Sequence, residues 1–179
     1  MTKQKIIIVG AGGHARVIFD LLNQQKIDIH AIIDPSRDID YLSKNFPNSK
    51  YFKHDDEILN DDPSEIMLIN GLGSIPNDGS KRKKVFYKFS EKGFKFLSIV
   101  SEQAIISPSV KLSEGAQVMS GAIIQSGVFI GLNSIVNTGA VVDHDCIIGD
   151  HTHIAPGAVL SGKVTTGESV HIGTNASVI

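Results

Sequence analysis

The sequence predicts two domains of different architecture: a small Rossmann-like α/β domain over residues 1–100 and a left-handed parallel β-helix over residues 101–179. The first half alternates short apolar runs with segments of helical apolar spacing, which is typical of α/β domains with a parallel sheet. From Ala104 the apolar pattern instead has a strict period of six. The low aromatic content, 6% with no Trp, suits a narrow core filled by Ile, Val, Leu and Ala.

Each element of the first half is indicated by a local pattern. Continuous apolar runs bounded by turn residues predict buried parallel strands, at Lys5–Val9, His30–Ile33, Ile66–Ile69 and Phe94–Val100. Apolar residues at helical spacing predict helices at Ala15–Leu22 and Ser80–Glu91, the second ending before Gly93. The stretch from Pro35 to Asp62 is polar and predicts no particular element.

The second half is a run of six-residue blocks that begins AIISPS, VKLSEG, AQVMSG and continues without insertion. The first position of each block is small or Val, and the third is aliphatic except at Thr166. Such a repeat predicts one short strand and one corner per block, with three blocks closing a triangular coil. Gly, Asn and Asp at the block ends suit the corner conformations. Since the last block stops at Ile179 without a polar cap, we expect that the helix is cut short there.

Composition narrows the classes of function. A net charge of −2 gives no basic field for nucleic acid or for an acidic membrane. The single cysteine, Cys146, excludes an internal disulfide and a cysteine-cluster metal site. No secretion signal precedes the first strand, and no apolar run approaches the ~18 residues of a membrane span. We therefore expect a cytoplasmic protein with neither nucleic acid nor a membrane as partner.

Four sequence features together resemble one family. These are GAGGHA after the first strand, Asp34 after the second, NGLGS after the third, and NTGAVVDHDCIIGDHTHIAPGAVLSG in the β-helix. They are similar to the sugar O-acyltransferases, which comprise sialic-acid O-acetyltransferases and N-acetyltransferases of the UDP-N-acetylbacillosamine pathway. The resemblance implies transfer of an acetyl group from acetyl-CoA, without a metal, to a nucleotide-linked 4-amino-4,6-dideoxy sugar. O-acetylation of sialic acid or a related sugar is the alternative.

By this resemblance His144 is the general base, and Asp145 orients it. The chemistry agrees, because an amine or hydroxyl must lose a proton as it attacks a thioester, and an imidazole accepts protons near neutral pH. A carboxylate on the other ring nitrogen would fix the tautomer. Asp143 also flanks His144 and competes for this role. The alternative is a solvated corner histidine without catalytic function.

The resemblance also implies residues that bind the two substrates. Those expected to bind the acceptor are Gly12, Gly13, His14, Asp34, Pro35, Gly73 and Asn137. Those expected to bind acetyl-CoA are His153, Gly162 and Thr174, with the Gly162 N–H polarising the thioester carbonyl. Gly71 is an alternative to Gly73, and Asn137 is equally typical of an ordinary corner. Pro35 stands where some members have a second acid, so the nucleotide preference stays open.

Spacing along the repeat indicates an assembly. A block of six residues between the faces that carry His144 and His153 should separate them by well over ~10 Å, at a rise of ~3.3 Å per residue. One chain should not bring both to one acetyl group. The resemblance implies a homotrimer with its site between adjacent β-helices.

Several other readings of the same residues stay open. His144, His151, His153 and His171 would allow a three-histidine metalloenzyme of the carbonic-anhydrase type, although their spacing does not match its ligand pattern. The glycines of the first loop also fit a NAD-binding fingerprint. A non-catalytic binder of sugar nucleotides is a third alternative. Cys146 occupies an inward position and is interpreted as core, and His171 as part of a structural ladder with His153. Lys81–Lys84 is interpreted as a solvated helix start, with attraction of phosphates as the alternative.

Overall fold

The computed structural model describes residues 4–74 and 80–179. Within these ranges the chain forms two compact units. Residues 4–73 and 80–97 make up the first, and Ser74 together with residues 98–179 makes up the second.

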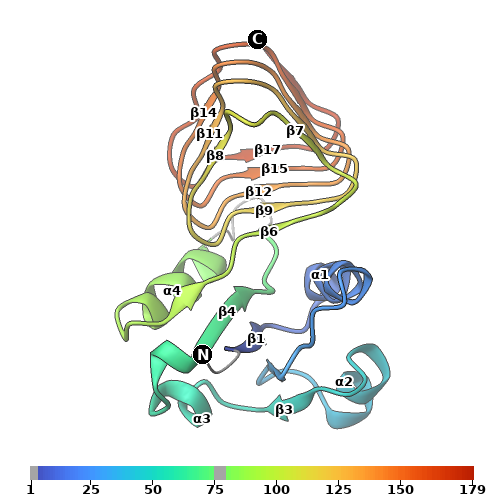
Figure 1. Ribbon diagram of the computed structural model, residues 1–179, viewed down its shortest axis with the longest axis vertical. Helices are drawn as coiled ribbons and strands as arrows, with labels where there is room; N and C mark the ends of the chain where they lie inside the picture. The colour runs from blue at the N-terminus through green and yellow to red at the C-terminus, as the bar shows by residue number, and fades with distance from the viewer. Residues whose placement is uncertain (1–3, 75–79) are drawn as a thin grey trace. The chain divides into compact units, whose positions relative to one another are not determined.

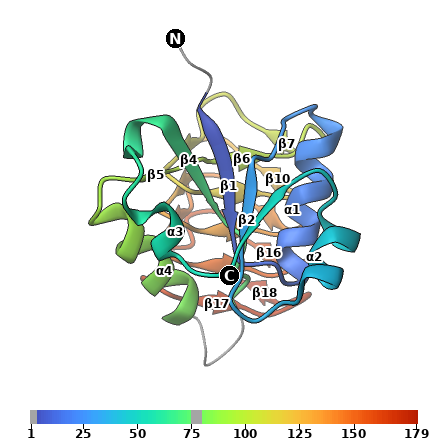
Figure 2. The ribbon, with the colours of Figure 1, turned by 90° about the horizontal axis from the view of Figure 1, so that it is seen from below.

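The first unit contains a five-stranded parallel sheet in the order β3-β2-β1-β4-β5 (Figure 2). The strands are β1 (Lys5–Val9), β2 (Ala31–Ile33), β3 (Lys50–Phe52), β4 (Ile66–Asn70) and β5 (Lys95–Phe96). The chain leaves β1 toward β2 on one side, while β4 pairs on the other, so the strand order reverses between β1 and β4. In open α/β sheets, ligands bind beyond the carboxyl ends of the strands at such a reversal.

Helices connect these strands, at α1 (Gly13–Gln24), α2 (Ile39–Asn45), α3 (Asp56–Leu59) and α4 (Ser80–Ser90), with a 3₁₀ turn η1 (Pro63–Glu65) before β4. Helix α1 buries Ala15, Ile18 and Leu22 at the helical spacing that the sequence displays. Helix α4 buries Phe86 and Phe89 in the same way. The predicted α/β domain with a parallel sheet is confirmed.

Two stretches of the first half differ from the sequence-based expectation. The polar segment from Pro35 to Asp62 contains α2, β3 and α3. These elements are too short for a clear apolar period, so tertiary packing rather than pattern defines them. The single strand expected at Phe94–Val100 divides, because β5 joins the first sheet whereas β6 (Ile99–Val100) pairs with β9 (Gln117–Val118) in the second unit. The repeat therefore begins one block earlier than Ala104.

The second unit is a left-handed parallel β-helix, as predicted (Figure 1). Its two-residue strands are β6, β7 (Ile105–Ile106), β8 (Lys111–Leu112), β9 (Gln117–Val118), β10 (Ile123–Ile124), β11 (Phe129–Ile130), β12 (Ile135–Val136), β13 (Val141–Val142), β14 (Ile147–Ile148), β15 (His153–Ile154), β16 (Val159–Leu160), β17 (His171–Ile172) and β18 (Ser177–Val178). They form three faces, in the orders β17-β15-β12-β9-β6, β18-β16-β13-β10-β7 and β14-β11-β8. In-register partners lie eighteen residues apart, as Ile124 and Val142 illustrate.

The core of the β-helix consists of the first and third residues of the blocks, which are fully buried in the central coils. From the block that begins at Val110 onward, the last residue of each complete block has a positive φ, at Gly115, Gly121, Gly127, Asn133, Gly139, Asp145, His151, Gly157, Lys163, Ser169 and Asn175. The block with Thr166 at its third position forms only an isolated bridge, from Thr165 to Ile147. The Thr166 hydroxyl accepts a hydrogen bond from the Gly149 N–H (3.0 Å). This bond explains why the third position of this block is polar and departs from the apolar pattern.

Candidate active site

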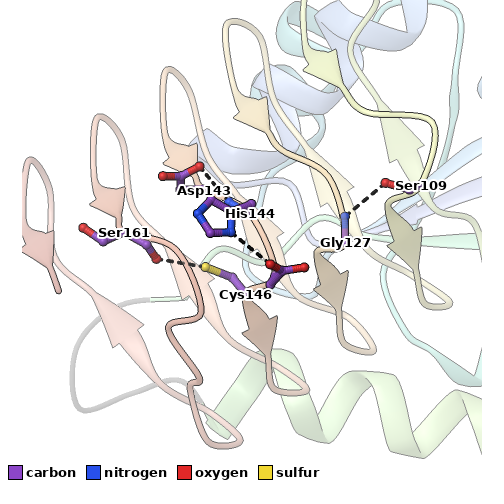
Figure 3. Close-up of polar contacts among 7 residues, drawn as sticks. Ser109, Gly127, Asp143, His144, Cys146 and Ser161 are labelled. Atoms are coloured by element: carbon purple, nitrogen blue, oxygen red, sulfur yellow. Dashed lines mark hydrogen bonds and ion pairs between the residues drawn. The ribbon is translucent and has the colours of Figure 1, made fainter.

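His144 lies at the corner that joins β13 to β14, where the triangular coil turns from one face to the next (Figure 3). Asp145 follows it at the same corner. The His144 Nδ1 lies 2.9 Å from the Asp145 Oδ2, and about half of each side chain is exposed. Because a carboxylate accepts and does not donate, the neutral ring in this contact has its proton on Nδ1 and its lone pair on Nε2. The nitrogen that is left to accept a proton is therefore Nε2.

The local backbone explains why these two residues meet. Asp145 occupies the left-handed corner position with a φ of 59°, a conformation that Asp and Asn adopt more readily than most residues. Its N–H donates to the Ser126 carbonyl of the preceding coil, and the His144 carbonyl accepts from the Lys163 N–H of the following coil. Backbone hydrogen bonds to the preceding and the following coil therefore hold the corner in place.

The neighbouring Asp143 and Cys146 have other partners (Figure 3). The Asp143 Oδ1 accepts from the backbone N–H of His144 (2.7 Å), so it is Asp145 that contacts the ring. The Cys146 thiol is buried and donates to the Ser161 carbonyl at 3.2 Å. Burial raises the pKa of the Cys146 thiol, which keeps it protonated and unsuited to nucleophilic attack.

Two glycines enclose the His144–Asp145 pair from the adjacent coils. A Cβ on Gly162, eighteen residues after His144, would lie 2.6 Å from the His144 Nε2 and 2.7 Å from its Cε1. A Cβ on Gly127, eighteen residues before Asp145, would collide with the Asp145 Oδ1. Gly162 was expected at the site and lies beside the imidazole. Gly127 was not expected, although the eighteen-residue spacing from Asp145 is the sequence signal that could have identified it.

His153 and Asn137 form a second group, on β15 and on the corner that follows β12. The His153 Nδ1 lies 2.9 Å from the Ser74 carbonyl, and its Nε2 lies 3.0 Å from the Asn137 amide nitrogen. Both ring nitrogens are therefore engaged, and only 7% of His153 is exposed. The His171 ring packs edge-on against the His153 ring at 4.8 Å between centroids, in the stacked ladder that the sequence predicts.

Thr174 is exposed at the corner between β17 and β18, two strands that continue the faces of β12 and β13. Asn137 and Thr174 therefore belong to one corner of the triangle, and His144 and Gly162 to the next. The residues expected to bind acetyl-CoA are divided between these two corners within one chain.

The first unit contains a cavity of about 490 Å³ beyond the carboxyl ends of β1 and β2. Its lining residues are Val9, Gly10, Ile33, Asp34, Pro35, Ser36, Asp55, Leu72, Lys81 and Val85. Two of the predicted acceptor residues, Asp34 and Pro35, line it. Lys81, from the segment interpreted as a solvated helix start or, alternatively, as a phosphate-attracting one, also lines it.

Asp34 has protein partners on both carboxylate oxygens. Its Oδ2 accepts from the Ala11 N–H at 2.7 Å, and its Oδ1 accepts from the N–H and hydroxyl of Ser36. The Tyr41 hydroxyl donates to the Ala11 carbonyl at 3.0 Å, so both backbone groups of Ala11 are bound by side chains. Asp34 and Tyr41 together hold the loop that contains Gly12, and Tyr41 was missed by the sequence analysis because it lies in the polar segment.

The loop after β4 packs against the loop after β1. A Cβ on Gly71 would lie 2.7 Å from the Gly10 carbonyl oxygen and 3.0 Å from the Ala15 Cβ. A Cβ on Gly73 would lie 3.4 Å from the Cβ of His14. The predicted acceptor residues of the two loops are therefore neighbours. A Cβ on Gly12 would meet open space, and one on Gly13 would meet only the Arg16 Nη2, at 4.0 Å.

In the described ranges, 4–74 and 80–179, no group of three or more His, Cys, Asp or Glu side chains is arranged to hold a metal ion. Over the same ranges, no helix is both long enough and apolar enough to cross a membrane.

Comparison with known proteins identifies the family. The model of the PglD N-terminal domain matches residues 5–89. The acetyltransferase domain of PglB from Neisseria gonorrhoeae FA1090, solved in complex with acetyl coenzyme A, is 30% identical, with a TM-score of 0.82 over 98% of this chain and 82% of that chain. The chain belongs to the hexapeptide-repeat sugar acetyltransferases. The predicted resemblance and the predicted acyltransferase class are both confirmed.

Two further structures extend the comparison within this fold. PerB from Caulobacter crescentus, in complex with CoA and GDP-perosamine, is 26% identical, with a TM-score of 0.71 over 98% of this chain and 91% of that chain. WeeI from Acinetobacter baumannii AYE shares the fold at 23% identity, with a TM-score of 0.79 over 97% of this chain and 79% of that chain. In this sugar acetyltransferase both units thus have counterparts in related structures.

Proposed function

We propose that this sugar acetyltransferase moves the acetyl group of acetyl-CoA to the 4-amino group of a nucleotide-linked amino sugar, with His144 as general base. The observation that carries the proposal is the hydrogen bond between His144 and Asp145 at an exposed corner, with Gly162 directly beside Nε2. A solvated corner histidine without function would need neither a carboxylate that orients its ring nor glycines on both adjacent coils, Gly127 beside Asp145 and Gly162 beside His144.

In the proposed reaction, the amine nitrogen attacks the thioester carbonyl carbon, and the carbonyl electron pair moves to oxygen. His144 Nε2 takes one proton from the attacking nitrogen, and Asp145 stabilises the imidazolium that results. The tetrahedral intermediate then expels the CoA sulfur, which receives the proton from His144. The products are an N-acetyl sugar and free CoA, and the imidazole returns to its starting state.

The cavity beyond β1 and β2 supports a nucleotide-linked acceptor. Its volume of about 490 Å³ is in the range of small-molecule sites, and its position at the reversal of strand order is where α/β sheets bind nucleotides. Lys81 at its lining offers a cation for a diphosphate. Binding of GDP-perosamine by PerB is consistent with this class of acceptor.

For the donor, the complex of PglB with acetyl coenzyme A supports acetyl-CoA as the co-substrate. Gly162 is proposed to polarise the thioester carbonyl through its N–H, and Thr174 to contact the cofactor from the other corner. His153 is proposed to contribute by holding Asn137, since both of its ring nitrogens are engaged.

A homotrimer with sites between adjacent β-helices is part of the proposal. The proposed donor residues occupy two corners of one triangle, so neighbouring copies could unite one corner from each chain. Exposed apolar side chains flank the His144 corner on both faces, with Phe129 and Ile147 on one and Val159 on the other. Burial of such residues between copies would favour association.

The test is a thiol-release assay with acetyl-CoA and a panel of UDP- and GDP-linked amino sugars, together with free sialic acid. We expect turnover with a nucleotide-linked amino sugar, and a decrease in kcat of about 10²–10⁴-fold for His144→Ala. Turnover with sialic acid alone would replace N-acetylation by O-acetylation. Near-wild-type kcat in the variant would remove His144 as the base.

A further inference from the structure

Arg82 is a buried arginine on α4, with 2% of its surface exposed. Its Nη1 donates to two carbonyl oxygens, those of Asn70 at the end of β4 (3.0 Å) and of Leu72 two residues later (2.6 Å). The two acceptors flank Gly71, and Leu72 lies in the loop between Gly71 and Gly73. The guanidinium thus connects the first turn of α4 to the loop that follows β4.

Asn70 completes the connection from the strand side. Its side-chain nitrogen donates to the Arg82 backbone carbonyl (2.9 Å), and its side-chain oxygen accepts from the Leu72 N–H (3.2 Å). The carbonyl and the N–H of Leu72 are therefore both bound by side chains. Ala11 in the loop after β1 is held in the same manner, by Asp34 and Tyr41.

Leu72 transmits this restraint to the cavity beyond β1 and β2. Its side chain lies over Gly10, where an added Cβ would come within 2.8 Å of the Leu72 Cδ2. Leu72 and Gly10 both line the cavity, as do Lys81 and Val85 of α4. A displacement of the loop after β4 would change the shape of this cavity and the contact between Gly73 and His14.

Packing alone does not require a charged group here. Helix α4 already contributes Phe86 and Phe89 to the core, and a buried guanidinium carries a large desolvation cost that an apolar side chain would avoid. Burial lowers the pKa of Arg82 to about 9, which leaves it a cation at neutral pH. What the buried guanidinium contributes is the pair of hydrogen bonds to the Asn70 and Leu72 carbonyls.

We propose that Arg82 and Asn70 are positioning residues for the acceptor: by binding both backbone groups of Leu72 they fix residues 71–73, directly after β4, in the conformation that receives the nucleotide. This inference rests on the proposed nucleotide-linked acceptor. It assigns to the pair a role in acceptor affinity and none in the binding of acetyl-CoA or in proton transfer.

The experiment compares Arg82→Met and Asn70→Ala with wild type by calorimetric titration with UDP, GDP and acetyl-CoA, and by steady-state kinetics. Lys84→Met is the matched control, since it removes an exposed charge from the same helix. We expect affinity for the preferred nucleotide to fall by about tenfold or more in both variants, because each loses side-chain hydrogen bonds that hold Leu72. The acceptor KM should rise in parallel, while the Kd of acetyl-CoA and the behaviour of Lys84→Met stay at wild-type values.

The double variant gives an independent check. Because both residues bind Leu72, their effects should not be independent. The fold-loss of nucleotide affinity in the double variant should therefore be close to the larger of the two single-variant losses, and well below the two fold-losses multiplied together. Should Arg82→Met fail to fold, Asn70→Ala decides, because it leaves the guanidinium in place. A folded variant that binds acetyl-CoA and the nucleotide as wild type does would overturn the inference while leaving the proposed function intact. Wild-type protein that binds acetyl-CoA but neither UDP nor GDP would refute the proposed acceptor, and the inference with it.

Discussion

Asp145 meets two physical demands at one position. As the last residue of its block it must adopt a positive φ, and as the neighbour of His144 it must supply an acceptor for Nδ1. Glycine satisfies the first demand at the equivalent position one coil earlier, Gly127, but has no oxygen to offer. Asp and Asn satisfy the conformational demand, and Asp also contributes the charge that stabilises an imidazolium.

Replacement of Asp145 by Asn separates the two demands. Asn tolerates the left-handed corner, so the thermal midpoint should stay close to that of wild type. The kcat should fall by about 10- to 100-fold, as when an orienting partner of a functional histidine is lost. Steady-state kinetics of Asp145→Asn beside Asp143→Asn provide the measurement. An equal loss in Asp143→Asn, whose carboxyl group contacts only the His144 backbone among the contacts described above, would contradict the assignment.

Gly162 is a steric determinant of the His144 ring position. A methyl group on Gly162 would lie 2.6 Å from Nε2, so Gly162→Ala should displace the imidazole and lower kcat by about tenfold or more. Gly167→Ala is the matched control, because its nearest neighbour would be 4.0 Å away. Crystal structures of both variants would check the displacement. An unmoved ring in Gly162→Ala, with normal turnover, would count against the described geometry.

At the scale of elements, the strands and corners of the β-helix were predictable because one pattern recurs every six residues. Thr166 was the single visible exception, and it is where the strand is missing. The short elements between Pro35 and Asp62 were not predictable, since α3 spans only Asp56–Leu59. Arg82 was also missed, because a lone arginine in a lysine-rich helix gives no sign in sequence that it is buried.

In the candidate site, too, features that follow the sequence repeat were predictable, and features that depend on tertiary contacts were not. The resemblance selected His144 and Asp145, and eighteen-residue spacing accounts for their contact with the coils above and below. Spacing could not show that His153 would be enclosed between Ser74 and Asn137, because Ser74 lies 79 positions away. Contacts across such a separation depend on the folded chain and have no local signature.

His171, whose ring packs edge-on against that of His153, gives the β-helix a sensitivity to acid. Burial lowers the pKa of His171 below its usual 6.5, so the folded state favours the neutral ring. As the pH falls below 6.5, the unfolded chain takes up this proton first, and the free energy of unfolding decreases until the folded-state pKa is passed. Urea unfolding between pH 7.5 and 5 should show this decrease, and His171→Asn should show a smaller one.

His30, whose pKa burial also lowers, makes the same kind of contribution in the first unit and remains in both proteins. An equal decrease in both proteins would show that His171 is not responsible.

At the scale of the whole molecule, the position of the donor residues on two corners leads to a complementation test. His144→Ala inactivates one corner and His153→Ala the other. If each site unites corners of adjacent copies, a mixed trimer of the two variants contains one intact site. Random mixing of equal amounts should then restore about a quarter of the wild-type activity.

The experiment requires that the two purified variants exchange subunits, which mass spectrometry of differently tagged chains can follow. Each variant alone is the control, and each is expected to be inactive. Mixed trimers without recovered activity would indicate that each site is built within one chain.

The strict repeat also limits how this enzyme can change its length. An insertion or deletion of eighteen residues adds or removes one full coil, and every residue beyond it keeps its face of the triangle. An insertion whose length is not a multiple of six moves residues from inward-facing to outward-facing positions in every later block. An insertion of six or twelve residues keeps the inward positions but moves all later residues to a different face of the triangle. Coils can therefore be gained or lost in whole turns above or below the coils that carry Gly127, His144 and Gly162, and the reactive corner keeps its geometry while the β-helix becomes longer or shorter.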